Sequence, residues 1–455
     1  MADALSEAIL SGRLSPGDRL PSHRELASEL GLSRSTAVRV YEEMRANGLL
    51  ESHPRSGNFV SLSTGVATPS GGSWMPSPVG LANPIDLSKA TTRADDAIIE
   101  VIRRSVDDIG TVLTRDGYDV LGTSELRHAV AESYERRGVA TSFDQILITT
   151  GAQQGIDLIA RLLVRANDVV LVESPTYAGL VDRMRHAQAE LIGLDVSEGP
   201  WDVERFAHNL RRTGAKLAFL TPDFQNPTGR LMDAQMRRDF AMAADRAGAT
   251  IVVDETNVEL GLDVPLPTTL PFAAYAPDRV SISIGSLSKC LWAGLRIGWL
   301  RSDANTIQAL ANLKITSTLA NPLLEQIAAV NLLSPEWFGP QMESRRAVLR
   351  VKRQRMGRSL TRMGLVADEP VGGLSYWARL PRGSGRSLAQ LALSRGLLLL
   401  PGSRLSPDGI LDGYLRLPFS LPSEELEEAC QTLESVWADF NGTSRTHDYF
   451  PGPVI

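Results

Sequence analysis

Short apolar runs separated by stretches of helical periodicity occupy most of the chain, from residue 85 to about residue 440. Runs of this length are typical of buried strands, and the stretches between them repeat their apolar positions as amphipathic helices do. Strands that alternate with helices predict an α/β domain built on a mainly parallel sheet. The clearest predicted strands lie at residues 146–148, 169–172, 217–220, 251–253 and 280–284.

The first sixty residues carry a different pattern, in which two short helices precede two short apolar runs. Ser22 and Glu25 have capping-box spacing ahead of an apolar stretch and predict a helix over residues 24–30. A second helix is predicted over residues 34–46. Two helices joined by a short turn predict a helix-turn-helix, and the two runs that follow predict a β-wing with its tip at residues 55–57.

Polar side chains at the start of the second helix and at the wing tip make this segment a candidate DNA-binding unit. Recognition helices meet base edges with their N-terminal residues, and a wing tip suits a phosphate or the minor groove. Helix-turn-helix geometry also occurs in ordinary helical packing, and arginines and acidic residues nearly balance here, so spacing alone leaves both interpretations open. The candidate DNA contacts are Arg34, Ser35, Thr36 and Arg39 on the helix and Arg55 on the wing.

The remaining composition narrows the class of protein. Residues 61–84 are rich in Ser, Gly and Pro and contain no charge, which predicts a linker, and residues 441–455 predict a loosely held tail. Two cysteines are too few for a disulfide framework and fit a reducing compartment. No apolar run approaches the roughly 18 residues of a membrane helix. We expect a cytoplasmic protein with no metal centre, and the net charge of −6 gives no sign of nucleic-acid binding.

Residues suited to one kind of chemistry follow the predicted strands. In an open parallel sheet, ligands bind beyond the carboxyl ends of the strands. The turn at residues 151–154 leads into a helix whose free N–H groups suit a phosphate. Tyr177 offers an aromatic surface, Asp254 a carboxylate and Lys289 a primary amine. Each feature alone is more often a cap, a packing residue or a surface turn, but together they supply what pyridoxal phosphate needs.

Lys289 stands out because lysine is scarce in this chain while arginine is abundant. Arginine cannot replace a lysine that must act as a nucleophile, since the guanidinium stays protonated. Ser286 and Ser288 lie just before Lys289, and Arg296 follows it seven residues on. The sequence therefore favours a Schiff-base lysine at this position.

Specific motifs add a family resemblance. The segment GRLSPGDRLPSHRELASELGLSRSTAVRVYEEMRANGLLESHPRSGNFV resembles the winged helix-turn-helix of GntR-type transcription regulators. The rest resembles fold-type I aminotransferases, specifically the aminotransferase-like domain of the MocR branch of those regulators. The motifs TTGAQQGIDLIARLL, DVVLVESPTYAGL, TPDFQNPTG, SLSKCLWAGLRIGW and YLRLPFS occur in family order. The resemblance implies a DNA-binding domain at residues 1–60, a linker at 61–84 and a pyridoxal-phosphate domain at 85–440, with a smaller α+β subdomain at about 345–440.

The resemblance also implies roles for single residues. Lys289 resembles the lysine that forms the internal aldimine, and Asp254 resembles the partner of the ring nitrogen. Asn226 matches the asparagine that bonds the ring 3′-oxygen, Arg416 the arginine that binds a substrate or effector carboxylate, and Tyr118 a tyrosine that reaches the phosphate of the partner subunit. The implied phosphate and ring contacts are Gly151, Ala152, Gln153, Ser286, Ser288 and Arg296, with Tyr177 stacked on the ring. The implied DNA contacts are Arg24, Arg34, Thr36, Arg39, Arg55, Ser56 and Gly57.

One position departs from the family pattern. Where the family often has a tyrosine shortly after the ring-nitrogen aspartate, this chain has Thr256. No phenol is available there to bond the 3′-oxygen. Cofactor binding through Asn226 is compatible with this change, whereas catalytic turnover loses one of its usual groups.

Three functional hypotheses are open at this stage. The first is a homodimeric transcription factor that binds paired half-sites in double-stranded DNA. It would respond to pyridoxal 5′-phosphate, or to an amine or amino acid, through the Lys289 aldimine. The second is an active pyridoxal-phosphate-dependent aminotransferase that carries a DNA-binding domain. The third is a DNA-binding protein whose aminotransferase-like fold only dimerises. The combined motifs favour the first.

Overall fold

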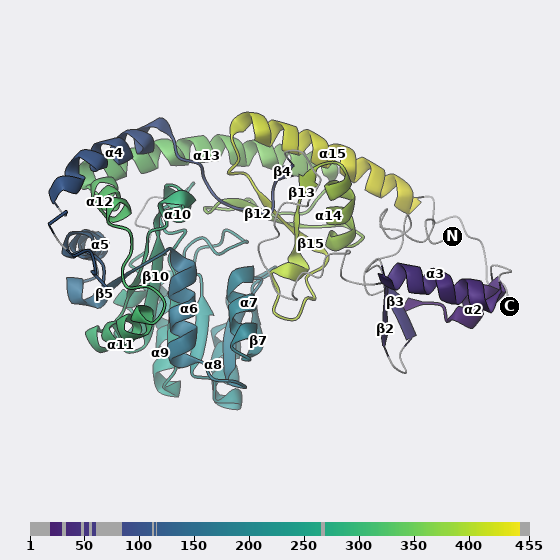
Figure 1. Ribbon diagram of the computed structural model, residues 1–455, viewed down its shortest axis with the longest axis horizontal. Coiled ribbons are helices and arrows are strands. Elements are labelled where there is room, and N and C mark those ends of the chain that lie inside the picture. Colours follow the sequence, from purple (N-terminus) through teal and green to yellow (C-terminus); the bar gives the residue numbers. More distant parts are fainter. Residues whose placement is uncertain are drawn as a thin grey trace.

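The computed structural model describes residues 19–29, 33–46, 50–53, 57–60, 84–111, 113–114, 116–264 and 269–445. These residues form a small N-terminal unit and a large unit that contains the rest of the helices and strands (Figure 1). Two predicted wing-tip contacts, Arg55 and Ser56, lie outside the described residues, as does nearly all of the predicted linker.

The N-terminal unit contains the two predicted helices and the two predicted wing strands, and a short strand that was not predicted, β1 (Arg19–Leu20), completes a three-stranded antiparallel sheet. Helix α2 (His23–Glu29) begins at the expected capping box, where the Ser22 amide donates to the Glu25 carboxylate at 2.7 Å. Tyr41 is fully buried under the helices, and its hydroxyl donates to the Pro21 carbonyl oxygen at 2.9 Å. The other elements are helix α3 (Arg34–Ala46) and the two wing strands, β2 (Leu50–His53) and β3 (Gly57–Val60).

A seven-stranded sheet forms the centre of the large unit, in the order β5-β11-β10-β9-β8-β6-β7. Strands β6 to β10 run parallel, and only β11 (Gly298–Arg301) pairs antiparallel, with both β10 and β5. The mainly parallel sheet is therefore confirmed. Its other strands are β5 (Ile146–Thr149), β6 (Val169–Ser174), β7 (Glu190–Asp195), β8 (Leu217–Leu220), β9 (Thr250–Asp254) and β10 (Ser281–Ser286).

Alternate residues of the central strands face opposite layers, because successive side chains of a strand point to opposite sides. Val170 and Val172 pack with one apolar cluster that includes helix α6, while Leu171 packs with the cluster that includes α8 and α9. Burial on both faces explains why the strands read as continuous apolar runs. The helices around the sheet are α5 (Ser124–Arg136), α6 (Ala152–Leu163), α7 (Ala178–His186), α8 (Val203–Thr213), α9 (Ala234–Ala247), α10 (Leu287–Cys290) and α11 (Ala304–Ile315).

A smaller subdomain follows the long helix α13 (Pro335–Met363) and carries a three-stranded sheet in the order β12-β15-β14. The predicted boundary at about residue 345 falls inside α13, which is shared by both parts (Figure 1). The last helix, α15 (Ser423–Arg445), continues past Phe440 into the predicted tail. The other elements are α4 (Asp96–Asp107), α12 (Leu323–Leu332), α14 (Gly385–Ser394), β12 (Ser375–Arg379), β14 (Leu400–Pro401) and β15 (Tyr414–Pro418).

The segment that follows the predicted linker is built into this subdomain. Strand β4 (Ile85–Asp86) pairs in parallel with β13 (Leu397–Leu398). From there the chain runs past the carboxyl ends of β9 and β10 and enters α4. These parallel strand ends are where ligands bind in open α/β sheets.

Candidate functional site

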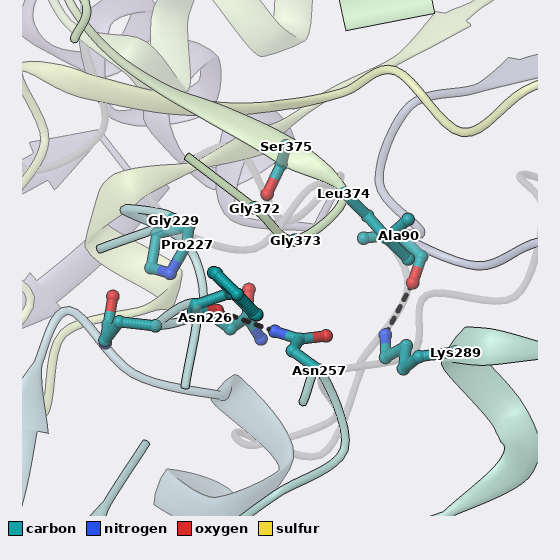
Figure 2. Close-up of a pocket in the computed structure, with 12 residues that line it drawn as sticks. Ala90, Asn226, Pro227, Gly229, Asn257, Lys289, Gly372, Gly373, Leu374 and Ser375 are labelled. Carbon is teal, nitrogen blue, oxygen red and sulfur yellow. Dashed lines mark hydrogen bonds between the residues drawn. The ribbon is translucent and has the colours of Figure 1, made fainter. Parts of the chain in front are cut away.

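A small hollow at the junction of the large and small subdomains is lined in part by Lys289 (Figure 2). Lys289 lies on the short helix α10, directly after β10, and its Nζ donates to the Ala90 carbonyl oxygen at 2.5 Å. Burial and the positive charge of Arg416 lower the pKa of Lys289 to about 8. The hollow is lined by Ala90, Phe224, Gln225, Asn226, Pro227, Gly229, Asn257, Lys289, Gly372, Gly373, Leu374 and Ser375.

Asp254 occupies the last position of β9, the strand next to β10. Its Oδ1 accepts a hydrogen bond from the Thr256 amide at 2.9 Å. Burial raises the pKa of Asp254, while the nearby Lys289 opposes that shift. A carboxylate in this setting gains strongly from a cationic partner, which a protonated ring nitrogen supplies.

The β5–α6 turn has the shape of an anion site. Gly151 adopts φ = 75°, a left-handed conformation that favours glycine, and a Cβ at this position would lie 2.6 Å from Arg296 Nη2, so the guanidinium would have to shift. Arg296 itself adopts φ = 50°, and its Nη2 donates to the Thr150 carbonyl oxygen at 2.9 Å. The free N–H groups at the start of α6 and this guanidinium therefore meet at one turn.

The other predicted phosphate contacts differ in their placement. Ser286 Oγ lies 3.0 Å from Ser288 Oγ and 3.1 Å from the Ile297 carbonyl oxygen, which holds both hydroxyls at the end of β10. Ala152 begins α6. The side chain of Gln153 is exposed, whereas Gln154 Oε1 accepts from the Thr150 amide at 2.7 Å. The prediction for Gln153 thus rests on its main chain alone.

Tyr177 and Asn226 lie on two loops that share a buried carboxylate. Tyr177 precedes α7, and its ring lies so close to Gly179 that a Cβ there would be 2.6 Å from a ring carbon. Glu173 is fully buried and accepts from Trp201 Nε1 at 2.6 Å, and also from the Thr221 amide and Gln225 Nε2. Burial raises the pKa of Glu173 to about 7. This residue, which the sequence analysis missed, joins the Tyr177 loop to the Asn226 loop.

Arg416 lies on β15 and is 5 % exposed. Its Nη2 donates to the Ser88 carbonyl oxygen, and among the described residues its Nε has no hydrogen-bond acceptor. Burial lowers the pKa of Arg416 to about 10. A buried guanidinium with an unused donor is suited to a carboxylate ligand, because such groups carry a large cost unless they are paired.

Tyr118 lies on the loop that precedes α5, and its side chain is 64 % exposed. Its amide donates a hydrogen bond to Asp116 Oδ1 at 3.1 Å, and Tyr118 is not among the residues that line the hollow. The hollow is therefore assembled without Tyr118 from this chain. A contact with a partner subunit stays a prediction.

The predicted DNA contacts that the structure describes lie on α2, at the start of α3 and on the wing. Arg24, Arg34, Ser35, Thr36 and Arg39 are all exposed. Ser33 caps α3, since its Oγ accepts from the Thr36 amide at 3.1 Å. On the wing, Gly57 adopts φ = 107°, a conformation that favours glycine.

Three features of the described residues fit pyridoxal phosphate. The backbone at Gly151 has a positive φ that favours glycine and lies beside the Arg296 guanidinium, Arg416 keeps an unused buried donor, and Lys289 is the one lysine that lines the hollow. Within the described chain, no cluster of His, Cys, Asp or Glu is arranged for a metal ion. Across the same residues, no helix has the length and apolarity needed to span a membrane.

Fold and site together define a pyridoxal-phosphate domain of the aminotransferase type, fused to a winged helix-turn-helix. Two family comparisons agree: residues 85–433 match aminotransferase class I and II, and residues 1–60 match the gntR family of bacterial regulatory proteins. The chain therefore belongs to the aminotransferase class I and II family and, through its GntR-type domain, to the MocR subfamily of transcriptional regulators. Its cofactor is pyridoxal 5′-phosphate, and its DNA-binding domain is GntR-type.

Relatives of both kinds resemble this chain. The uncharacterized HTH-type transcriptional regulator YdfD of Bacillus subtilis is 28% identical, with 94% of each chain covered. The probable rhizopine catabolism regulatory protein MocR of Rhizobium meliloti is 28% identical over 88% of this chain and 85% of its own. Among solved structures, the α-aminoadipate aminotransferase LysN of Thermus thermophilus, complexed with N-(5′-phosphopyridoxyl)-L-leucine, has a TM-score of 0.71 at 27% identity. That match covers 79% of this chain and 94% of LysN.

Several residues that the sequence analysis did not assign contact the site. They provide main-chain carbonyls, such as Ser88 and Ala90, or lie in the layer behind the turn, such as Thr150 and Asn321. A carbonyl oxygen is the same in every residue type, so no sequence signal marks Ser88 or Ala90. The sequence signal for Lys314 was only that it is another of the few lysines of this chain.

Proposed function

We propose that this protein is a homodimeric transcription factor whose DNA binding responds to pyridoxal 5′-phosphate and, through it, to an amine or amino acid. The single observation that carries the proposal is a shared segment. Lys289 and Arg416 both donate hydrogen bonds to carbonyl oxygens of residues 88–90, which lie a few residues after the predicted linker.

Further contacts of Ser88, Lys89 and Thr92 hold the 88–90 segment in place. Ser88 N and Oγ both donate to Asp86 Oδ1, at 2.9 and 2.5 Å, and Lys89 forms an ion pair with Asp86 at 2.7 Å. Thr92 Oγ1 lies within hydrogen-bonding distance of the carbonyl oxygens of Lys289 and Leu291, at 3.1 and 2.9 Å. The segment is thus a continuous connection from the reactive lysine towards β4.

Ligand binding changes the donors that hold this segment. When bound, the cofactor supplies an aldehyde carbon for the Lys289 amine. Lys289 Nζ then has fewer protons to donate, so its bond to the Ala90 carbonyl weakens. The Arg416 guanidinium donates to a ligand carboxylate, and its hydrogen bond to the Ser88 carbonyl oxygen weakens. Both changes favour a different position of residues 88–90, and a ligand shifts a protein between conformations only through such differential contacts.

The finer features of DNA binding follow from the dimer. Two recognition helices related by symmetry favour paired half-sites about 34–36 Å apart, or a multiple of that spacing. The exposed Arg34 and Arg39 are the proposed contacts of each helix. Binding through phosphates weakens steeply as salt rises.

The experiment is a fluorescence-anisotropy titration of a labelled duplex from upstream of the protein's own gene, at low salt, with and without pyridoxal 5′-phosphate. We expect the cofactor to change the DNA affinity of the wild type at least severalfold and to have no effect on the Lys289→Ala variant. Lys216, which is exposed and donates to the Ala247 carbonyl, provides the matched control Lys216→Ala, and we expect it to respond as the wild type does. Equal affinities of the wild type with and without cofactor would contradict the proposal.

A second candidate function is amino-acid transamination, which the placement of Arg416 beside Lys289 and Asp254 favours. Thr256 stands against efficient turnover, since its side chain supplies no phenol. Incubation of the holoprotein with a panel of amino acids and a keto acid separates the two. Many turnovers per site support the enzyme, while a spectral change that stops at one equivalent supports the regulator.

A further inference from the structure

A second buried lysine lies behind the phosphate turn. Lys314 is in the last turn of α11 and is 0 % exposed. Its Nζ donates to the Val120 carbonyl oxygen at 2.7 Å, the Ile148 carbonyl oxygen at 2.8 Å and Asn321 Oδ1 at 2.6 Å. An ammonium group has three protons, so these three neutral acceptors use all of them.

Among the described residues Lys314 has no anionic partner, in contrast to several buried or half-buried arginines. Arg237 pairs with Asp223 at 2.7 Å, Arg137 with Glu255 at 3.1 Å and Arg301 with Asp278 at 3.1 Å. A buried charge is costly unless an opposite charge compensates it. Here burial lowers the pKa of the ammonium to about 8, which leaves it charged at neutral pH.

The contacts of Lys314 lead to the phosphate turn through one amide. Asn321 is 2 % exposed, and its Nδ2 donates to Thr150 Oγ1 at 2.9 Å while its Oδ1 accepts from Lys314. Thr150 in turn gives its carbonyl oxygen to Arg296 and its amide to Gln154. Two cations, one exposed and one buried, therefore converge on the residue that precedes Gly151.

We propose that Lys314 is a positioning residue of the phosphate site, which fixes the Thr150–Gly151 turn through Asn321 and adds a second positive charge behind it. The inference rests on the proposed placement of the cofactor phosphate at this turn. The phosphate dianion then provides the compensating charge that the surrounding side chains do not. Arg296 contacts the anion directly, and Lys314 acts from the layer beneath.

A purely structural role is the competing interpretation, because Lys314 also joins β5 to the segment at Val120. The two roles differ in what they predict for a ligand without a phosphate. A structural defect weakens every ligand of the hollow, whereas a lost charge weakens only the ligand that carries the anion. Pyridoxal 5′-phosphate and pyridoxal form this matched pair.

The test measures equilibrium affinities of both ligands for cofactor-free wild type, Lys314→Met and Lys314→Gln by absorption titration. We expect both variants to bind pyridoxal 5′-phosphate on the order of tenfold or more weakly, the scale of losing one partly buried charge, and to bind pyridoxal as the wild type does. Inorganic phosphate should compete with pyridoxal 5′-phosphate on the wild type and lose that effect in the variants. Lys216→Met removes a lysine that also donates to a main-chain carbonyl, and it controls for net charge.

The outcomes separate this inference from the proposed function. Equal losses for both ligands, or no loss for either, overturn the role of Lys314 while leaving the cofactor response intact. Failure of the wild type to bind either ligand contradicts the proposed function and the inference with it. Should Lys314→Met not fold, Lys314→Gln keeps side-chain donors for the carbonyl oxygens and carries the same prediction.

Discussion

Lys289 and Lys314 are both buried and both have a lowered pKa, but they differ in the hydrogen bonds of their amino groups. Burial brings the pKa of each to about 8. Lys314 places its three protons on three oxygen atoms in a closed setting, whereas Lys289 has one acceptor, the Ala90 carbonyl, and lines the hollow. Asp254 and Arg416 act on Lys289 with opposite signs, while only burial acts on Lys314.

The comparison teaches that a depressed pKa does not by itself mark a reactive lysine. A nucleophile needs a free lone pair and a path to its substrate, and a lysine held by three acceptors has neither. The number of hydrogen bonds at Nζ, together with access to the hollow, separates the reactive amine from the fixed charge.

The largest expected difference between the two lysines is in covalent attachment. After treatment with pyridoxal 5′-phosphate and borohydride, the wild type should carry one label per chain, on the peptide that contains Lys289. Lys289→Ala should lose this label completely, because no other lysine lines the hollow. Lys314→Met should keep the label when the cofactor is saturating. Intact mass and peptide mapping measure the result, and labelling of Lys314 would refute the distinction.

Replacing Lys314 should destabilise the folded protein more than replacing Lys289. Lys314→Met leaves three oxygen atoms without a donor and should lower the unfolding free energy of the cofactor-free protein by about 2–4 kcal/mol. Lys289→Met leaves one such oxygen and removes a buried charge, so its effect should stay within about 1 kcal/mol. Urea midpoints followed by tryptophan fluorescence test the difference. Equal midpoints for the two variants would show that hydrogen-bond saturation does not distinguish the lysines.

Much of the fold was predictable because its signals are local. Continuous apolar runs identified β6, β8, β9 and β10, since a strand covered on both faces has no polar side. The capping box fixed the start of α2 to within a residue. Strand β11 was not predicted. Its antiparallel direction could not be predicted either, because an apolar pattern does not encode the direction of a strand. Helix α15 extends into the predicted tail, whose sequence has little apolar periodicity.

The site was predictable where chemistry requires a particular side chain. Lys289, Asp254 and Arg416 each supply a group that few residue types offer, and the structure brings Asp254 and Arg416 close enough to Lys289 to act on its pKa. Glu173 and Asn321 were missed because their function depends on contacts between segments far apart in the chain. No local pattern reports that Asn321 reaches Thr150.

The smallest expected effect is a shift in the pKa of Lys289 when a neighbouring charge is removed. The neutral amine of Lys289 is the reactive form, so the rate of its reaction with pyridoxal should rise with pH through a midpoint of about 8. Arg416 lowers the pKa of Lys289, so Arg416→Met should move the midpoint up. Asp254 raises that pKa, so Asp254→Asn should move the midpoint down, each by about a unit or less.

Lys314→Met is the control for this titration, because its charge does not contribute to the pKa of Lys289. Its midpoint should equal that of the wild type even though its affinity for pyridoxal 5′-phosphate falls. Rates measured by stopped-flow absorbance from pH 6 to pH 10 give all four midpoints. A shift in Lys314→Met as large as that in Arg416→Met would mean that the two lysines are electrostatically coupled, and that neither the reactive amine nor the fixed charge acts independently of the other.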